Sequence, residues 1–259
     1  MNNTISFQMM GGLGNILFPF ATSYAISKRF DLDLKLFYHH TGYIHTHPLT
    51  YKDNLFKNVD TIKDINNFHI INQNKFEFYN LEIPKNKNIF LNGYFQSEKN
   101  FIEYKKELLD ILCPDKNLIH DLINKYPNIQ DDKTVSIHIR KGNYKNLQEF
   151  HPLLPNEYYY KALENFKEHK IFIFSDELED CYHIFKKYEC IFVKNNFDLH
   201  DMYLMSLCKN NIIANSTFSW WGAWLNKNKN KKIIAPKLWF GKNSCYNSKD
   251  IIPEDWITI

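Results

Sequence analysis

Two polar residues at the end of an apolar stretch have side chains that could bind an anion. In VSIHIRKGNY (135–144), a strand pattern carries His138 and Arg140 and then runs into a turn at Gly142. Side chains alternate along a strand, so His138 and Arg140 share one face and the apolar residues share the other. A planar guanidinium at the end of a strand can grip two phosphate oxygens at once. The structural alternative is an ion pair between Arg140 and an acidic neighbour.

Two turns between a strand pattern and a helix pattern could hold the same kind of ligand. In GGLGN (11–15), glycines let the backbone approach a ligand, and the helix N-terminus that follows favours negative charge, although a plain tight turn explains the motif equally well. ANSTFSWWGAW (214–224) leaves a strand through Asn215, Ser216 and Thr217, whose hydroxyl and N–H groups suit a diphosphate. Ser216 could also be a simple helix N-cap, and both interpretations can hold together. The tryptophans that follow are expected mostly in the core.

A third strand pattern ends in a carboxylate. In FSDE (174–177), Asp176 comes directly after the strand. Its oxygens could accept hydrogen bonds from N1–H and the exocyclic amine of a guanine. Helix capping by Ser175 or Asp176 explains the same residues equally well.

Two patterns resemble metal sites but have ordinary explanations. Asp31 and Asp33 form a DxD sequence between a helix pattern and a strand pattern, where aspartate is common in turns. Four histidines crowd one segment without the cysteines or carboxylates that would complete a zinc site: His39, His40, His45 and His47. We therefore expect no metal, and a histidine loop that is solvated or contacts substrate.

The elements that position these residues follow from hydrophobic periodicity. In the first half, strands are predicted at 5–9, 32–37 and 89–94, and helices at 18–30, with Pro19 in the first turn, and at 101–112; most of 39–88 stays unassigned. In the second half, strands at 134–140, 171–174, 191–193, 212–214 and 232–235 alternate with helices around 158–169, 177–187, 199–208 and 219–226. Such alternation predicts parallel sheets, whose ligands bind beyond the carboxyl ends of the strands.

Arg140 falls at such an end. The polar stretch at 125–133 is the predicted border between two α/β domains, 1–130 and 131–259, with a cleft between them.

Composition narrows the class of protein. The chain has 259 residues, 44% of them hydrophobic, which is enough for a sizeable core and excludes a disordered chain. A net charge of +3 falls short of a nucleic-acid-binding surface and weakly suits an anionic small molecule or peripheral contact with a membrane. Five cysteines form no CxxC pair, which favours reduced thiols in the cytoplasm. The sequence shows no signal peptide and no transmembrane segment.

Four motifs in order give the chain a strong resemblance to the family 11 glycosyltransferases, the α-1,2-fucosyltransferases. The family's opening GGLGNQxFQYA reads GGLGNILFPFA here (11–21), and its HxRRGDY reads HIRKGNY (138–144). Its ANSTFSWWGAWL is unchanged (214–225), and IIAPKLWF (233–240) matches the segment near the end. The similarity covers nearly the whole chain.

The resemblance implies a GT-B-like fold, in which two Rossmann-like domains with parallel sheets face a cleft. Residues 1–130 would form the acceptor-side domain with the GGLGN loop, and residues 131–259 the donor domain. It also implies GDP-fucose as donor and co-substrate, a galactose-terminated glycan as acceptor, inversion at the anomeric carbon, and no metal or other cofactor.

The site residues follow from the same resemblance. Arg140 matches the arginine that binds the donor β-phosphate, where it would neutralise the charge that grows on the leaving GDP. His138 matches the histidine near the nucleotide, and Asp176 the acidic position after the FS strand. The remaining donor-contacting positions are Gly12, Gly14, Asn15, Asn215, Ser216, Thr217, Phe218 and Ser219.

Four positions depart from the family motifs. Ile16 and Pro19 replace two glutamines, and Asn143 replaces an aspartate. Lys141 replaces an arginine, which keeps the positive charge but lacks the planar guanidinium that binds two oxygens at once. There are two alternatives to an α-1,2-fucosyltransferase. One is a fucosyltransferase that makes another linkage, and the other is a non-catalytic protein that binds a sugar nucleotide or a glycan. Glu149 is the nearest carboxylate that could act as general base. Because no carboxylate is obviously preorganised, we favour a dissociative path in which Arg140 drives departure of GDP.

Overall fold

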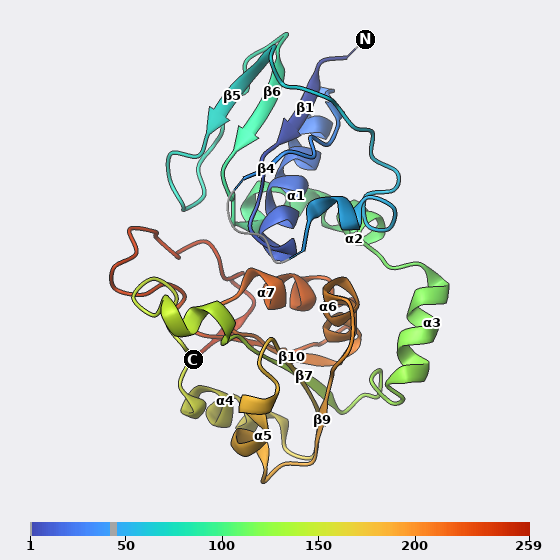
Figure 1. Cartoon of the computed structure of the whole chain (residues 1–259), viewed down its shortest axis with the longest axis vertical. Helices are drawn as coiled ribbons and strands as arrows, with labels where there is room; N and C mark the ends of the chain where they lie inside the picture. Colours follow the sequence, from blue (N-terminus) through green and yellow to red (C-terminus); the bar gives the residue numbers. More distant parts are fainter. Residues whose placement is uncertain (1, 42–45) are drawn as a thin grey trace. The chain divides into compact units, whose positions relative to one another are not determined.

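The computed structural model describes residues 2–41 and 46–259, and the chain forms two compact units (Figure 1). Unit 1 contains Met1–Leu112 and Tyr246–Pro253, and unit 2 contains Cys113–Cys245 and Glu254–Ile259. The sequence places the border at residue 130, whereas the units divide at 112–113. The segment that follows helix α3 (Lys116–Lys125) is fastened to unit 2, because the Tyr126 hydroxyl donates to the Lys194 carbonyl (3.0 Å).

Unit 1 is built on a parallel sheet. Its strand order is β3-β1-β6-β5, with β1 at Thr4–Phe7, β3 at Asp33–Leu34, β5 at Phe68–Asn72 and β6 at Asn88–Asn92. A small second sheet pairs β2 (Met9–Met10) with β4 (His40–Thr41). The helices are α1 (Leu13–Phe30) and α2 (Lys105–Ile111), with short 3₁₀ turns at Pro48–Tyr51, Glu98–Asn100 and Ile102–Tyr104. The strand predicted at 32–37 is therefore only two residues long, and β5 lies in the unassigned region.

Helix α1 begins earlier than its hydrophobic pattern predicts. It starts at Leu13, directly after the N-cap Gly12, so Pro19 lies in the helix interior and not in the first turn. Proline has no N–H to donate to the carbonyl four residues earlier, that of Asn15. The GGLGN motif is thus partly the first turn of the helix itself.

Unit 2 is built on a six-stranded parallel sheet with the order β12-β11-β10-β7-β8-β9. The strands are β7 (Thr134–Ile139), β8 (Lys170–Ser175), β9 (Cys190–Phe192), β10 (Asn210–Ile212), β11 (Ile233–Ala235) and β12 (Ile257–Thr258). The longer helices are α3, α4 (Asn156–Leu163), α5 (Glu179–Phe185), α6 (Asp198–Leu207) and α7 (Thr217–Trp224). Short 3₁₀ turns lie at Gly142–Asn146 and Glu164–Phe166. The predicted α/β class with parallel sheets is confirmed.

The two faces of this sheet are covered by different helices (Figure 1). Val135, Ile137 and Ile139 share one buried cluster with side chains of α4 and α5. The other face carries Ser136 and His138 toward α6 and α7, and the rings of His138 and Phe218 lie 5.5 Å apart. The predicted alternation along β7 is confirmed, and it turns His138 toward the helix that starts in the ANST turn.

Three tryptophans of α7 are fully buried, as expected: Trp220, Trp221 and Trp224. All five cysteines are free thiols. Among the helices of residues 2–41 and 46–259, none combines the length and the hydropathy that crossing a membrane requires.

Candidate active site

Strand register in unit 2 places Arg140 beside Asp176. Strands β7 and β8 are parallel neighbours, and Ile139 pairs with Ser175, the last residue of each strand. The next residue along each chain therefore lies at the same edge of the sheet. Arg140 Nη1 contacts Asp176 Oδ2 at 2.7 Å, with side chains that are 17% and 24% exposed. The acidic neighbour that the structural interpretation requires is present, at the edge where α/β proteins bind ligands.

Two further residues fix the guanidinium from the turn after β7. Arg140 Nη2 donates to Asn143 Oδ1 at 2.6 Å, and Arg140 Cζ lies 5.3 Å from the centre of the Tyr144 ring. The amide at position 143, where the family has an aspartate, accepts a hydrogen bond without adding negative charge. Arg140 thus keeps a defined orientation with one carboxylate fewer beside it than the family motif would supply.

Gly142 allows the turn to close on Asp176. A β-carbon at this position would lie 2.2 Å from Asp176 Oδ2, so only glycine fits. The Lys141 N–H donates to the other carboxylate oxygen at 2.9 Å. Ser175, and not Asp176, makes the local turn, because its Oγ accepts from the Glu177 N–H (3.0 Å). The observed contacts of Asp176 orient Arg140, and its contact with a guanine stays a prediction.

Tyr144 connects Arg140 with the ANST turn and was not singled out from the sequence. Its hydroxyl donates to the Asn215 carbonyl at 3.1 Å, and its ring stacks on His151 with centroids 4.8 Å apart. Burial raises the pKa of Tyr144 to about 12 against the opposing effect of Arg140, so the hydroxyl stays protonated. Burial, and then Arg140, lowers the pKa of His151. The position of Tyr144, four residues after Arg140 in one short turn, is the signal that could have revealed it.

His138 is a buried, neutral imidazole. It is 4% exposed, and its Nδ1 has no hydrogen-bond partner within the described part of the chain. Its pKa is lowered to about 4, chiefly by burial; Asp176 opposes this shift, and Arg140 adds to it. A buried polar atom without a partner is costly, so this atom is suited to a ligand group.

The ANST turn presents a second buried atom of this kind. Asn215 is 2% exposed and donates from Nδ2 to the carbonyls of Pro152 (2.9 Å) and Trp239 (3.2 Å). Its Oδ1 is buried, and no hydrogen bond to it occurs in residues 2–41 or 46–259. Asn215 and His138 lie at neighbouring parallel strands, since β10 pairs with β7.

Helix α7 begins in this turn without a side-chain capping hydrogen bond or an acidic side chain to offset the positive end of its dipole. Ser216 is its N-cap residue but makes no capping hydrogen bond with its side chain, and the first turn contains no acidic residue. Ser219 Oγ donates back to the Ser216 carbonyl (3.2 Å), while Thr217 and Phe218 are partly exposed. The positive end of the helix dipole is therefore suited to an anion, and the capping interpretation of Ser216 is wrong for its side chain.

Unit 1 holds the glycine motif at the carboxyl edge of its own sheet. Gly11 has φ of +69°, and a β-carbon there would lie 2.4 Å from Asn15 Nδ2. Gly12 caps α1, and Gly14 is buried in the first turn. Asn15 Oδ1 accepts from Nε2 of the buried Gln96 at 2.9 Å, a contact that the sequence did not reveal.

Glu149 lies in an exposed loop of unit 2. Its Oε2 accepts from Asn243 Nδ2 at 2.7 Å, and its backbone carbonyl accepts from the Asn243 N–H at 3.2 Å. These contacts tie Glu149 to the 241–243 segment. The carboxylate is thus exposed and held by the exposed Asn243 amide, and it does not lie in a buried pocket.

The described residues of the two metal-like patterns make local contacts. Asp31 ends α1 in the left-handed conformation, and Asp33 starts β3. His39 stacks on Phe37, and His47 Nδ1 accepts from the Leu49 N–H. His45 lies outside the described residues, and nothing is described of the His40 side chain. In the described ranges, no three His, Cys, Asp or Glu side chains gather as metal ligands would.

The lowered pKa of His138 predicts a specific pH dependence of stability. The unfolded chain binds the imidazole proton with a pKa near 6.5, more tightly than the folded chain does, so lowering the pH from 6.5 toward 4 favours unfolding. Between pH 6.5 and pH 4 the unfolding free energy of the wild type should fall by about 3 kcal/mol more than that of His138→Gln, which has no imidazole at this position. Urea unfolding followed by tryptophan fluorescence measures this in unit 2, which holds all five tryptophans. The exposed His183→Gln is the control, and equal pH slopes for wild type and His138→Gln would contradict the assignment.

Comparison with known proteins gives the family and the fold. The sequence model of glycosyl transferase family 11 matches residues 50–259. An alpha-1,2-colitosyltransferase of Escherichia coli is 32% identical over 285 residues, which cover 97% of this chain and 97% of that protein. The O-antigen biosynthesis glycosyltransferase WbnK of Escherichia coli is 36% identical over 182 residues, which cover 64% of this chain and only 59% of that protein.

Solved structures of fucosyltransferases share the fold at low identity. NodZ alpha-1,6-fucosyltransferase of Bradyrhizobium, soaked with GDP-fucose, gives a TM-score of 0.56 at 12% identity, covering 86% of this chain and 92% of that one. POFUT1 in complex with GDP-fucose gives 0.56 at 11% identity, covering 90% and 98%. The fold is therefore the GT-B α/β fold of these enzymes, and the chain belongs to glycosyl transferase family 11.

Proposed function

We propose that this glycosyltransferase moves L-fucose from GDP-fucose to the 2-hydroxyl of a terminal galactose, with inversion and without a metal, in the cytoplasm. The observation that carries the proposal is the guanidinium of Arg140. It is partly exposed at the carboxyl edge of the unit 2 sheet and is oriented by Asp176, Asn143 and Tyr144. A cation fixed there can meet the diphosphate of a sugar nucleotide.

The surrounding groups fit a nucleoside diphosphate sugar. The uncompensated N-terminus of α7 favours phosphate oxygens, and the buried His138 Nδ1 and Asn215 Oδ1 offer sites for ligand hydrogen bonds. A guanidinium has five N–H donors, so Arg140 can bind phosphate while it keeps its contact with Asp176. As the bond between fucose and GDP breaks, negative charge grows on the β-phosphate, and Arg140 stabilises it.

The acceptor proton follows the departure of GDP in this proposal. Glu149 is exposed and tied to Asn243, so no preorganised carboxylate is proposed as general base. Departure of GDP, driven by Arg140, leaves an oxocarbenium-like sugar that the acceptor hydroxyl attacks from the opposite face. The proton then passes late to phosphate or water.

One observation favours a second donor. The relative that matches 97% of the chain is a colitosyltransferase by name, and colitose is L-fucose without its 3-hydroxyl. The two donors differ in one polar group, and a site built to bind that hydroxyl discriminates strongly against the sugar that lacks it. Transfer of a colitosyl group is therefore the second candidate function.

A donor and acceptor screen tests the function. We expect GDP release from GDP-fucose that depends on a β-galactoside and persists in EDTA, with a product whose linkage to galactose O2 is read by NMR. Faster transfer from GDP-colitose would reassign the donor, and a different linkage would reassign the acceptor position. A strict requirement for Mn²⁺ or Mg²⁺ would contradict the metal-free mechanism. Binding of GDP without any transfer would indicate a non-catalytic protein.

Substitution of Glu149 tests the dissociative path. Glu149→Gln removes the carboxylate and keeps its shape, so kcat should stay above about a hundredth of wild type, the low end of the loss expected for a general base. The control is Glu157→Gln, another exposed glutamate in unit 2. A larger loss in Glu149→Gln, with GDP binding intact, would identify Glu149 as the base.

A further inference from the structure

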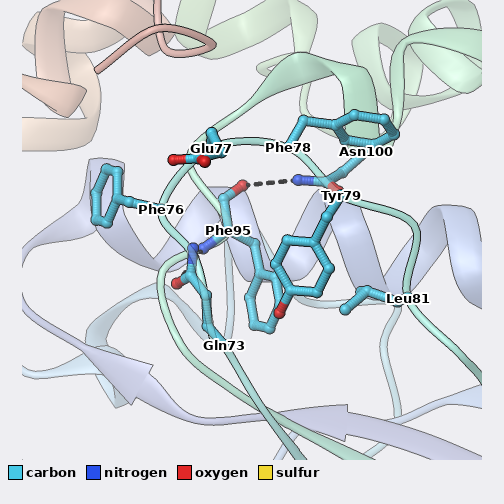
Figure 2. A pocket seen from close by; sticks show the side chains of 8 residues that line it. All are labelled: Gln73, Phe76, Glu77, Phe78, Tyr79, Leu81, Phe95 and Asn100. Atoms are coloured by element: carbon cyan, nitrogen blue, oxygen red, sulfur yellow. Dashed lines mark hydrogen bonds between the residues drawn. The ribbon is translucent and has the colours of Figure 1, made fainter. Parts of the chain in front are cut away.

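The small pocket of unit 1 fastens the loop that follows β5, the end strand of its sheet (Figure 2). It encloses about 10 Å³, the space of about one water molecule. Asn100 Nδ2 donates across it to the Phe95 carbonyl at 3.2 Å. Gln73 Oε1 accepts from the N–H groups of Tyr94 (2.7 Å) and Phe95 (3.1 Å). The pocket is therefore suited to a water molecule and not to a larger ligand.

Strand β9 is the end strand of the sheet in unit 2, and the outer side of its backbone has no partner strand in the described part of the chain. The Val193 N–H donates to the Ile173 carbonyl of β8 at 2.9 Å. Successive residues of a strand direct their backbone groups to opposite sides, so Ile191 and Val193 point to β8, and Cys190 and Phe192 point outward. Within residues 2–41 and 46–259, the outward N–H and C=O groups of Cys190 and Phe192 make no hydrogen bond. They can pair with another strand.

The next outward residue ends this free edge. The Lys194 N–H donates to the Tyr126 hydroxyl at 3.2 Å, and the Lys194 carbonyl accepts from the same hydroxyl at 3.0 Å. The backbone groups that remain available are therefore those of the short strand Cys190–Phe192.

This edge is complementary to itself. In an antiparallel pair, two residues that face each other can exchange two hydrogen bonds. A two-fold axis through Ile191, perpendicular to the sheet, would set Cys190 of each copy opposite Phe192 of the other. All the outward groups of both strands would then be satisfied, and the 39% exposed Ile191 would pack on its own copy. Such reciprocity is what a symmetric dimer interface requires.

Helix α5 carries an exposed stripe with opposite charges at its two ends. Glu179, Tyr182, His183 and Lys186 are exposed and follow the spacing of one helix face. Neither Glu179 nor Lys186 has an ion-pair partner among the residues that the structure describes. Two such stripes placed antiparallel would bring Glu179 of each copy to Lys186 of the other, so the stripe is electrostatically complementary to itself.

The strand and the stripe can share one symmetry axis. The side chains of Cys190 and Phe192 pack against the buried cluster to which α5 contributes, so α5 covers this face of β9 (Figure 1). The ring of Tyr182, at the middle of the stripe, lies 4.5 Å from the ring of Phe192. Phe192 is next to Ile191, so the middle of the stripe lies beside the middle of the strand.

We propose that the chain forms a symmetric dimer through this surface. Strand β9 pairs antiparallel with β9 of a second copy, and the two α5 stripes lie side by side, with each contact between Glu179 and Lys186 made twice. All strands of unit 2 run parallel, so the axis turns the carboxyl edges of the two sheets, and the Arg140 sites on them, in opposite directions. The dimer goes beyond the proposed function and does not depend on it.

Sedimentation equilibrium of the full chain measures the dimer and its Kd. The wild type should approach the mass of two chains and not the 31.1 kDa of one. Glu179→Lys and Lys186→Glu each bring like charges together twice, so each should weaken dimerisation about tenfold or more. The double variant carries opposite charges in exchanged positions, and its Kd should return to near that of the wild type.

The double variant also separates the interface from the stability of α5. Lysine at the start of a helix and glutamate at its end both oppose the helix dipole. An effect that acted through folding of α5 would therefore be largest in the double variant, whereas an interface effect is smallest there. Melting temperatures of the three variants measure the folding effect directly.

Substitution of Ile191 tests the strand pairing. Ile191→Lys sets two like charges together at the axis and should leave the chain monomeric. Its melting temperature should stay near that of the wild type, because the side chain is already exposed. The matched control is Ile70→Lys, which replaces a 49% exposed isoleucine of β5 and should leave the dimer intact.

Several results would overturn the proposal. A wild-type chain that stays monomeric up to about 0.1 mM would exclude a dimer of useful affinity. A mass that grows beyond two chains would contradict a closed two-fold interface. An unchanged dimer in Ile191→Lys, its loss in Ile70→Lys, or a double variant weaker than both single variants would place the interface elsewhere. Because the readout is mass, failure to transfer a sugar would refute the proposed function and leave the dimer standing.

Discussion

The ion pair between Arg140 and Asp176 depends on the register of two parallel strands, and the candidate site depends on the ion pair. Strands β7 and β8 end at paired residues, so the residues that follow them, Arg140 and Asp176, meet at the edge of the sheet. Gly142 lets the following turn close over the carboxylate, and that turn delivers Asn143 and Tyr144 to the guanidinium. The positive charge of Arg140, which we propose stabilises the leaving GDP, is thus positioned by the sheet and by the turn that follows β7.

Most of the sheet of unit 2 could be predicted from the sequence, because strands β7, β8, β9 and β10 are each followed by a helix before the next strand begins. The two-residue strand β12 was too short to be predicted. Unit 1 was harder to predict, for physical reasons. Its strand β5 lies in an Asn-rich segment and has no fully buried residue, and β3 has only two residues, so neither shows a clear hydrophobic period. Proline is usual at helix starts, yet α1 begins before Pro19 because glycines form its first turn. The return of residues 246–253 to unit 1 depends on contacts of Asp250 with Lys99 and Phe78, which no local pattern encodes.

The contacts of the candidate site also fall into those that could be predicted from the sequence and those that could not. Arg140, His138 and the Asn215 turn stand at strand ends in short motifs, so their proximity could be predicted from alternation and parallel pairing. A long-range contact such as that of Gln96 with Asn15 joins segments with no shared periodicity, and only the folded chain shows it. The partner of Asp176 could not be predicted from the sequence either, because capping, guanine binding and an ion pair would all use the same carboxylate oxygens.

Transfer kinetics of Arg140 variants, measured beside GDP binding and thermal stability, test the central claim most directly. If Arg140 stabilises charge on the leaving diphosphate, Arg140→Ala should raise the barrier to transfer by about 2.7–4 kcal/mol, as loss of a preorganised donor does elsewhere. Arg140→Lys should recover little of this loss, because an ammonium cannot reproduce the planar fork that contacts Asp176 and Asn143 and that we propose also binds phosphate. Transfer by Arg140→Lys at close to the wild-type rate, with unchanged stability, would contradict the account and make Arg140 a structural ion-pair residue.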